Sequence, residues 1–224
     1  MRSHTRDISL WEGQLMHAVC LIALSFLVWC GWRLFAEPFS ALYWFAFLVP
    51  VVHQVFVWLA WRLELKSSLV SRTIGFQAFL VVFIVLFLLR FISLALLGWA
   101  DQGSLGIPNE LKLLLLFILL VPGLYAMYSV KRYFGLGRAA GADHFEITSQ
   151  TNILEKRGIF QYTNNGMYVY AFLLFWAIGL IFSSKAALVI ALYSHIYIWV
   201  HYYSTERPDM EYIYGVTAKR SNSS

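Results

Sequence analysis

Six long apolar stretches, separated by polar segments, run through the chain. A helix needs roughly 20 residues to cross about 30 Å of hydrocarbon, and the first four stretches meet that length within error. The fifth is shorter and would span only about 24 Å as a helix. The pattern predicts an all-α, polytopic integral membrane protein with about six transmembrane helices, at residues 17–35, 39–61, 74–97, 113–130, 167–182 and 186–203.

The last two apolar stretches are separated only by Ser183, Ser184 and Lys185. They predict a short, partly shielded helical hairpin. A hairpin returns both of its ends to one face of the membrane. The polar segments 158–168 and 203–215, about forty residues apart in the chain, are therefore expected to be neighbours in space.

The basic residues are distributed unevenly between the two sides of the predicted membrane. With six spans both termini lie on one side, and 13 of the 17 Lys and Arg residues fall there. Only Arg33, Lys112 and Lys185 fall on the opposite side, and Arg90 lies within the third stretch. Because cytoplasmic loops carry the excess of Lys and Arg, both termini are predicted to be cytoplasmic. The membrane is then the inner membrane of a bacterium or the endoplasmic reticulum of a eukaryote.

Composition supports this class and disfavours others. Apolar residues make up 60% of the chain and charged residues 13%, whereas a soluble domain carries about 25% charged residues. The basic residues form no aromatic-interleaved patch, so no nucleic-acid partner is predicted. No His/Cys cluster has metal-ligand spacing, so no metal site is predicted. Cys20 and Cys30 would lie about 15 Å apart along one helix, which excludes a disulfide between them.

Two polar, aromatic-rich segments flank the predicted hairpin. Their distinctive residues are Gly158, Phe160, Tyr162, Asn165, Met167 and Tyr168 in the first segment, and Glu206, Pro208, Tyr214 and Gly215 in the second. This pattern resembles the membrane-embedded methyltransferases, which include phosphatidylethanolamine N-methyltransferases and isoprenylcysteine carboxyl methyltransferases. The Asn-x-Met-Tyr sequence is closer to the phospholipid branch. Gly166 stands where the family has proline, and Thr205 where it has the first of two glutamates.

The resemblance covers about residues 131–215 and implies S-adenosylmethionine as methyl donor. It divides the chain into a four-helix transmembrane region, 1–130, and a methyltransferase-like region, 131–224. The donor is expected between the hairpin base and the C-terminal segment, where Glu206 suits its ammonium or ribose hydroxyls and Asn165 its carboxylate. Tyrosines suit the adenine or the sulfonium. The implied binding residues are Gly135, Gly137, His144, Tyr162, Asn165, Met167, Tyr168, Tyr203, Glu206 and Pro208.

The function predicted is methylation of a membrane lipid, most simply the amine headgroup of a phosphatidylethanolamine-type lipid that reaches the site sideways from the bilayer. Glu206, Glu211 and His201 are candidate catalytic residues that accept the proton of the amine, with Asp209 as a further choice. One alternative is methylation of a carboxylate or thiol on another lipophilic acceptor. Another is a membrane scaffold or small transporter of the same fold without catalysis.

Three polar residues inside the apolar stretches have two interpretations each. His53 and Gln54 mark either a site or a helix-to-helix hydrogen bond. Arg90 is predicted to extend outward to the nearer membrane surface, with binding of a lipid phosphate as the alternative.

Overall fold

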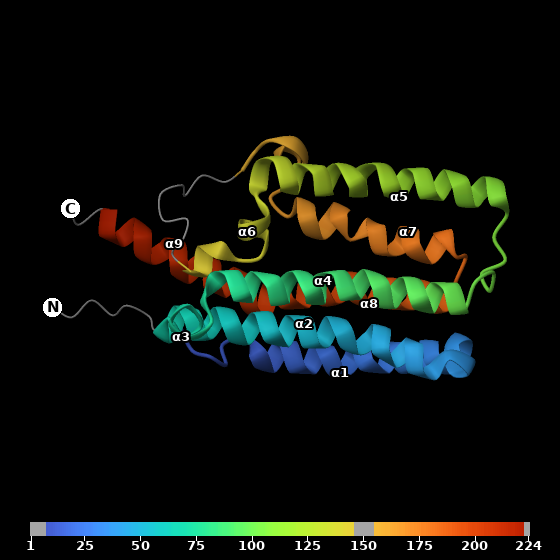
Figure 1. Ribbon diagram of the computed structural model, residues 1–224, viewed down its shortest axis with the longest axis horizontal. Helices are drawn as coiled ribbons and strands as arrows, with labels where there is room; N and C mark the ends of the chain where they lie inside the picture. Colours follow the sequence, from blue (N-terminus) through green and yellow to red (C-terminus); the bar gives the residue numbers. More distant parts are fainter. Residues whose placement is uncertain (1–7, 146–154, 222–224) are drawn as a thin grey trace.

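The computed structural model describes residues 8–145 and 155–221, and all regular elements within these ranges are helical (Figure 1). The predicted all-α fold is confirmed. Helices α3 (Leu69–Thr73), α6 (Leu136–Ala139) and α9 (Arg207–Ser221) lie at one end of the bundle. The long bundle is built from α1 (Gln14–Gly31), α2 (Ser40–Ser67), α4 (Gly75–Ala100), α5 (Asn109–Ser129), α7 (Leu173–Ile181) and α8 (Lys185–His201).

Four helical stretches in the described part of the chain are long and apolar enough to cross a membrane. They fit an integral membrane protein, whereas the apolar helix Met167–Ile181 is shorter. The exact count of six crossings stays a prediction. The four stretches are Gln14–Ser67, Gly75–Ala100, Asn109–Phe134 and Lys185–Tyr214.

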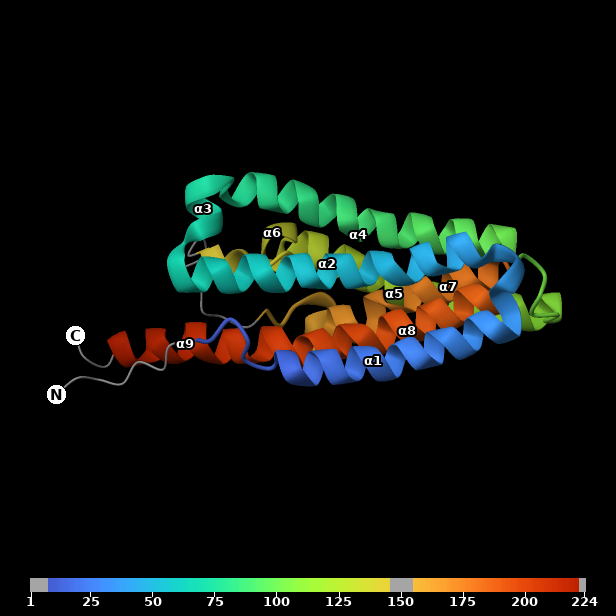
Figure 2. The same cartoon turned by 90° about the horizontal axis from the view of Figure 1, so that it is seen from below.

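The first of these stretches folds back on itself, as Figure 2 shows for α1 and α2. Its 54 residues would measure about 80 Å as one straight helix. Instead, Trp58 near the end of α2 donates a hydrogen bond of 3.0 Å to the carbonyl of Leu10, which precedes α1. The reversal lies at 32–39, where a π-helical turn (Trp32–Ala36) and a 3₁₀ turn (Glu37–Phe39) join the two helices.

Helices α7 and α8 are packed neighbours joined by three residues, Phe182 to Ser184. Ser184 caps α8 by accepting the N–H of Ala187 at 3.0 Å, as serine commonly does at a helix start. Asp101, at the end of α4, accepts the Ser184 hydroxyl at 2.6 Å. Farther along, Trp176 donates to Nδ1 of His195 at 3.1 Å, so His195 is hydrogen-bonded as part of the packing.

The core joins both halves of the chain, because α8 packs against α1, α2, α4 and α7. Tyr193 and Tyr197 of α8 are fully buried beside Leu24 of α1 and Phe175 of α7. The outer faces are also apolar, and Leu15 is 81% exposed. Such a surface is rare on soluble monomers and is suited to lipid. Cys20 and Cys30 are both free.

Candidate functional site

The two segments that flank α7 and α8 meet at one end of the bundle. Tyr168 lies in the π-helical turn Met167–Ala171 that precedes α7, and Glu206 ends the π-helical turn Tyr202–Glu206 that follows α8. The hydroxyl of Tyr168 donates a hydrogen bond to Oε2 of Glu206. Asn165 begins the first of these turns through its backbone carbonyl, which accepts the N–H groups of Tyr168 and Val169 at 3.0 and 3.1 Å.

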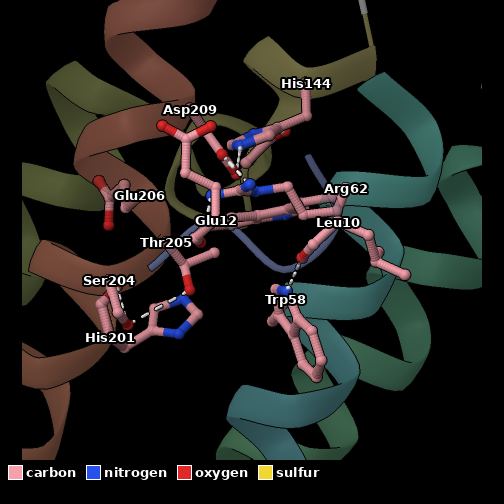
Figure 3. Close-up of polar contacts among 12 residues, drawn as sticks. Leu10, Glu12, Trp58, Arg62, His144, His201, Ser204, Thr205, Glu206 and Asp209 are labelled. Atoms are coloured by element: carbon pink, nitrogen blue, oxygen red, sulfur yellow. Dashed lines mark hydrogen bonds and ion pairs between the residues drawn. The ribbon is translucent and has the colours of Figure 1, made fainter. Parts of the chain in front are cut away.

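A buried ion pair fastens the start of α9 to α2, as Figure 3 shows. Arg62 of α2 and Asp209 of α9 have no exposed side-chain surface, and Nε of Arg62 lies 2.6 Å from Oδ1 of Asp209. Nη2 of Arg62 also donates to the carbonyl of Glu12 at 3.2 Å, and Nη1 donates to the carbonyl of Ser9. These contacts satisfy a charge that would be very costly to bury alone. The sequence pattern predicts only that Arg62 contributes to the positive charge of the cytoplasmic side.

His144 connects the same carboxylate to the glycine-rich segment before it. Its Nε2 lies 3.2 Å from Oδ2 of Asp209, and its Nδ1 lies 3.1 Å from the carbonyl of Gly141. Its ring stacks on Trp61 with centroids 4.1 Å apart. Both ring nitrogens are therefore occupied, so the geometry suits a positioning role for His144 better than the predicted contact with a cofactor.

The ring of Trp61 packs so closely against residue 141 that this position requires glycine. The φ of Gly141 is +91°, and an added Cβ would lie 2.4 Å from Nε1 of Trp61. We expect Gly141→Ala to lower the unfolding temperature markedly, because a left-handed backbone costs about 1–2 kcal/mol for alanine and the ring must also shift. Gly103→Ala is the matched control, since Gly103 has φ +81° with nothing near its added Cβ. Equal unfolding temperatures for both variants, measured by scanning fluorimetry, would contradict this account.

A cavity of about 150 Å³ lies inside the bundle beside this end. Residues of α2, α4, α5 and α8 line it, together with residues of the turn before α7. Leu136 of α6 also lines it. Most of the lining is apolar and aromatic. Four strongly polar side chains line it, namely His53, Gln54, Arg90 and His201.

Arg90 corrects one expectation from the sequence. Its side chain does not extend outward, because the residue is only 3% exposed and lines the cavity. Helical side chains tilt toward the N-terminus of their helix, and the N-terminus of α4 lies at the end of the bundle that carries α3. The guanidinium lies over the rings of Phe172 and Phe175, 5.3 Å from each centroid.

The three predicted catalytic residues have different surroundings. His201 is buried and lines the cavity, and its Nδ1 has no hydrogen-bond partner among residues 8–145 and 155–221. Glu206 is adjacent to the cavity through Tyr168, which lines it. Glu211 is exposed and pairs with Arg207 at 3.0 Å, so the structure does not bring it to the cavity.

Of the other residues predicted to bind the cofactor, Met167 and Tyr168 line the cavity. Gly135 and Gly137 flank Leu136 at its wall. Asn165 and Pro208 are half-buried nearby in the chain, outside the lining. Tyr162 and Tyr203 are exposed, and Tyr203 stacks on Trp199. The structure therefore brings Met167, Tyr168, His201 and Glu206 together and leaves both exposed tyrosines at the surface.

The side chain of Thr205 is buried against α1. The side-chain amide of Gln14 of α1 donates from Nε2 to the hydroxyl of Thr205 at 3.1 Å, and its Oε1 lies 2.9 Å from Nδ1 of His17. Nε2 of His17 lies 2.9 Å from the hydroxyl of Tyr197. A glutamate at 205 would bury its charge in this chain of neutral groups. Two polar residues three positions apart at the start of an apolar stretch were the available signal for this network.

A largely apolar cavity among membrane-type helices is lined by Tyr168 and His201, and the carboxylate of Glu206 is hydrogen-bonded to Tyr168, an arrangement suited to an amphiphilic ligand. The family model described as phospholipid methyltransferase matches residues 111–217, so this part of the chain is similar to that family. The resemblance predicted from the sequence is thereby confirmed, and the match begins within α5, before residue 131. No curated protein and no solved structure matches the chain.

Proposed function

We propose that the protein transfers a methyl group from S-adenosylmethionine to the amine headgroup of a phosphatidylethanolamine-type lipid at the cytoplasmic face of a membrane. The family domain supports methyl transfer to a phospholipid. The observation that carries the proposal is the position of the cavity: it lies among apolar helices, yet Tyr168 and His201 line it where the two matched segments meet.

The residues at this end fit S-adenosylmethionine. Bound there, it supplies an electrophilic methyl group on a sulfonium. The partly buried carboxylate of Glu206 suits an ammonium or ribose hydroxyls. The rings of Trp199 and Tyr202 lie 5.9 and 5.8 Å from that of Tyr168, and this cluster suits adenine or a cation. Asn165, half-buried one turn before Tyr168, suits the carboxylate.

The reaction also requires that the lipid amine is held in line with the methyl group and that the proton of the amine is removed. Apolar walls from α4 and α5 suit an acyl chain and keep water from the reacting groups. His201 lines the same cavity, its Nδ1 has no hydrogen-bond partner in the described part of the chain, and it is our choice for the proton acceptor. Fixed alignment of amine and methyl group supplies much of the rate in such a displacement.

The proposal includes the topology. Helices α1, α2, α4, α5, α7 and α8 give six crossings, with α7 and α8 as the short hairpin. Residues 8–13 and α9 lie at one end of the bundle, because Arg62 contacts both. With six crossings, the excess of Lys and Arg on that side makes it cytoplasmic.

The test uses the full-length protein in nanodiscs that contain phosphatidylethanolamine, with S-adenosylmethionine carrying a labelled methyl group. We expect label in the phospholipid fraction, as methylated ethanolamine headgroup. The exposed variant Glu211→Gln is the control and should transfer label at the wild-type rate. Label in another lipid or small molecule would contradict the acceptor, and a folded protein that transfers no label would contradict the activity.

A further inference from the structure

Arg90 is a buried cation that pairs with no Asp or Glu among residues 8–145 and 155–221. It lies within α4, and its Nε and Nη2 atoms have no hydrogen-bond partner in the described residues. No Asp or Glu is among the described residues that line the cavity. A charge buried in apolar surroundings is very costly unless it is paired, so this arrangement is suited to an anionic ligand.

Two further polar side chains, His53 and Gln54, line the same cavity. His53 and Gln54 of α2 are 4% and 2% exposed, and neither ring nitrogen of His53 nor either amide atom of Gln54 is hydrogen-bonded within the described residues. The surroundings of His53 are aromatic, with the ring centroid of Phe83 4.8 Å away. Native proteins pair nearly all buried polar groups, so three such side chains in one cavity favour a ligand that can pair with them.

We infer that Arg90, His53 and Gln54 form an oxyanion site that holds the phosphate of the lipid acceptor. This inference rests on the proposed function and names the part of the lipid that is recognised. A guanidinium fork matches two oxygens of a phosphate, and the amide N–H of Gln54 and a ring N–H of His53 are additional donors. One cation in a cavity lined by no acid matches the single charge of a phosphodiester.

The position of the site relative to the reacting end supports a lipid source for the phosphate. Arg90 lies over Phe172, the last residue before α7, and Tyr168 lies one turn before Phe172. A phosphate held by Arg90 therefore leaves the ethanolamine linker to extend toward Tyr168 and His201, which line the same cavity. The apolar rings around Arg90 suit the glycerol backbone and the first part of the acyl chains.

The test measures binding, which requires no methyl transfer. Full-length protein in neutral detergent is titrated calorimetrically with a short-chain phosphatidylethanolamine, with the diacylglycerol of the same chains, with inorganic phosphate and with S-adenosylhomocysteine. We expect Arg90→Met to weaken binding of the phosphatidylethanolamine by about 10- to 100-fold, since hydrogen bonds to charged groups are lost. Binding of diacylglycerol and of S-adenosylhomocysteine should not change.

Matched variants separate loss of the charge from loss of the fold. Arg33→Met removes an exposed arginine that pairs with Glu37 at 2.6 Å, and should leave all four affinities unchanged. Arg90→Lys should bind the phosphatidylethanolamine with intermediate affinity, because lysine lacks the planar fork. If Arg90→Met does not fold, Gln54→Leu is the second variant and should weaken the same binding by several-fold.

Three results would overturn the inference. The first is unchanged affinity for phosphatidylethanolamine in Arg90→Met. The second is weakened binding of S-adenosylhomocysteine alone, which would assign the site to the donor's carboxylate. The third is tighter binding of inorganic phosphate than of the lipid. A protein that binds lipid through Arg90 but transfers no methyl group would contradict only the proposed function, whereas normal methylation and lipid binding by Arg90→Met would contradict only this site.

Discussion

Asp209→Asn is expected to lower the free energy of unfolding by about 3–5 kcal/mol, because it leaves a buried arginine without its counter-charge. Asparagine keeps the size and shape of the side chain, so the change isolates the charge. The side chains of Arg62 and Asp209 have no exposed surface, so bulk solvent does not reach the pair. The measurement is thermal unfolding of the purified protein in detergent, followed by intrinsic fluorescence. We expect a large fall in the unfolding temperature and a reduced yield of monodisperse protein.

The neighbouring exposed pair provides the control. Arg207 and Glu211 lie on the same helix with side chains 57% and 65% exposed, and Glu211→Gln should leave the unfolding temperature unchanged. The double variant Arg62→Met, Asp209→Leu should recover much of the stability, because replacing a buried pair by apolar residues is often close to neutral. If Asp209→Asn unfolds at the same temperature as Glu211→Gln, the buried pair does not hold α9 in place.

The apolar pattern predicted the helices because burial in lipid demands long runs without charges. Predicted stretches 17–35 and 186–203 correspond to α1, Gln14–Gly31, and α8, Lys185–His201. The C-terminal ends differ by a few residues because each apolar run extends beyond the α-helix into the π-helical turn that follows it, such as Trp32–Ala36. No local hydrophobic period distinguishes such a turn from the α-helix before it.

Chain connectivity made only part of the site predictable from the sequence. Tyr168 and Glu206 meet because α7 and α8 form a hairpin, which brings the segments before and after it to the same end of the bundle. The ion pair of Arg62 with Asp209 joins positions far apart in the chain and depends on how α2 packs, which a local pattern does not contain. Arg90 was misjudged for a related reason. The outward direction suits a single helix in lipid, whereas the bundle provides a cavity on the inner side.

His201→Gln is expected to lower kcat for methyl transfer by about 100- to 10,000-fold, the range that removal of a general base commonly produces. Glutamine is similar in size and polar, but its amide does not accept a proton at neutral pH. Binding of S-adenosylhomocysteine should change little, because His201 lines the cavity that we propose for the lipid, and Glu206 is the proposed contact for the donor. Single-turnover transfer of a labelled methyl group gives the rate, and calorimetry gives the affinity.

Separate measurements of the transfer rate and of the affinity for S-adenosylhomocysteine distinguish the proton acceptor from the residue that contacts the methyl donor. Glu206→Gln should weaken S-adenosylhomocysteine binding by about 10- to 100-fold, since it removes a charged acceptor. His195→Gln is the control on α8, because His195 is hydrogen-bonded to Trp176 and lies outside the cavity lining. A wild-type kcat in His201→Gln together with a large loss of kcat in Glu206→Gln would move the proton acceptor to the carboxylate. In that case the unpaired nitrogen of His201 would serve to orient the lipid headgroup.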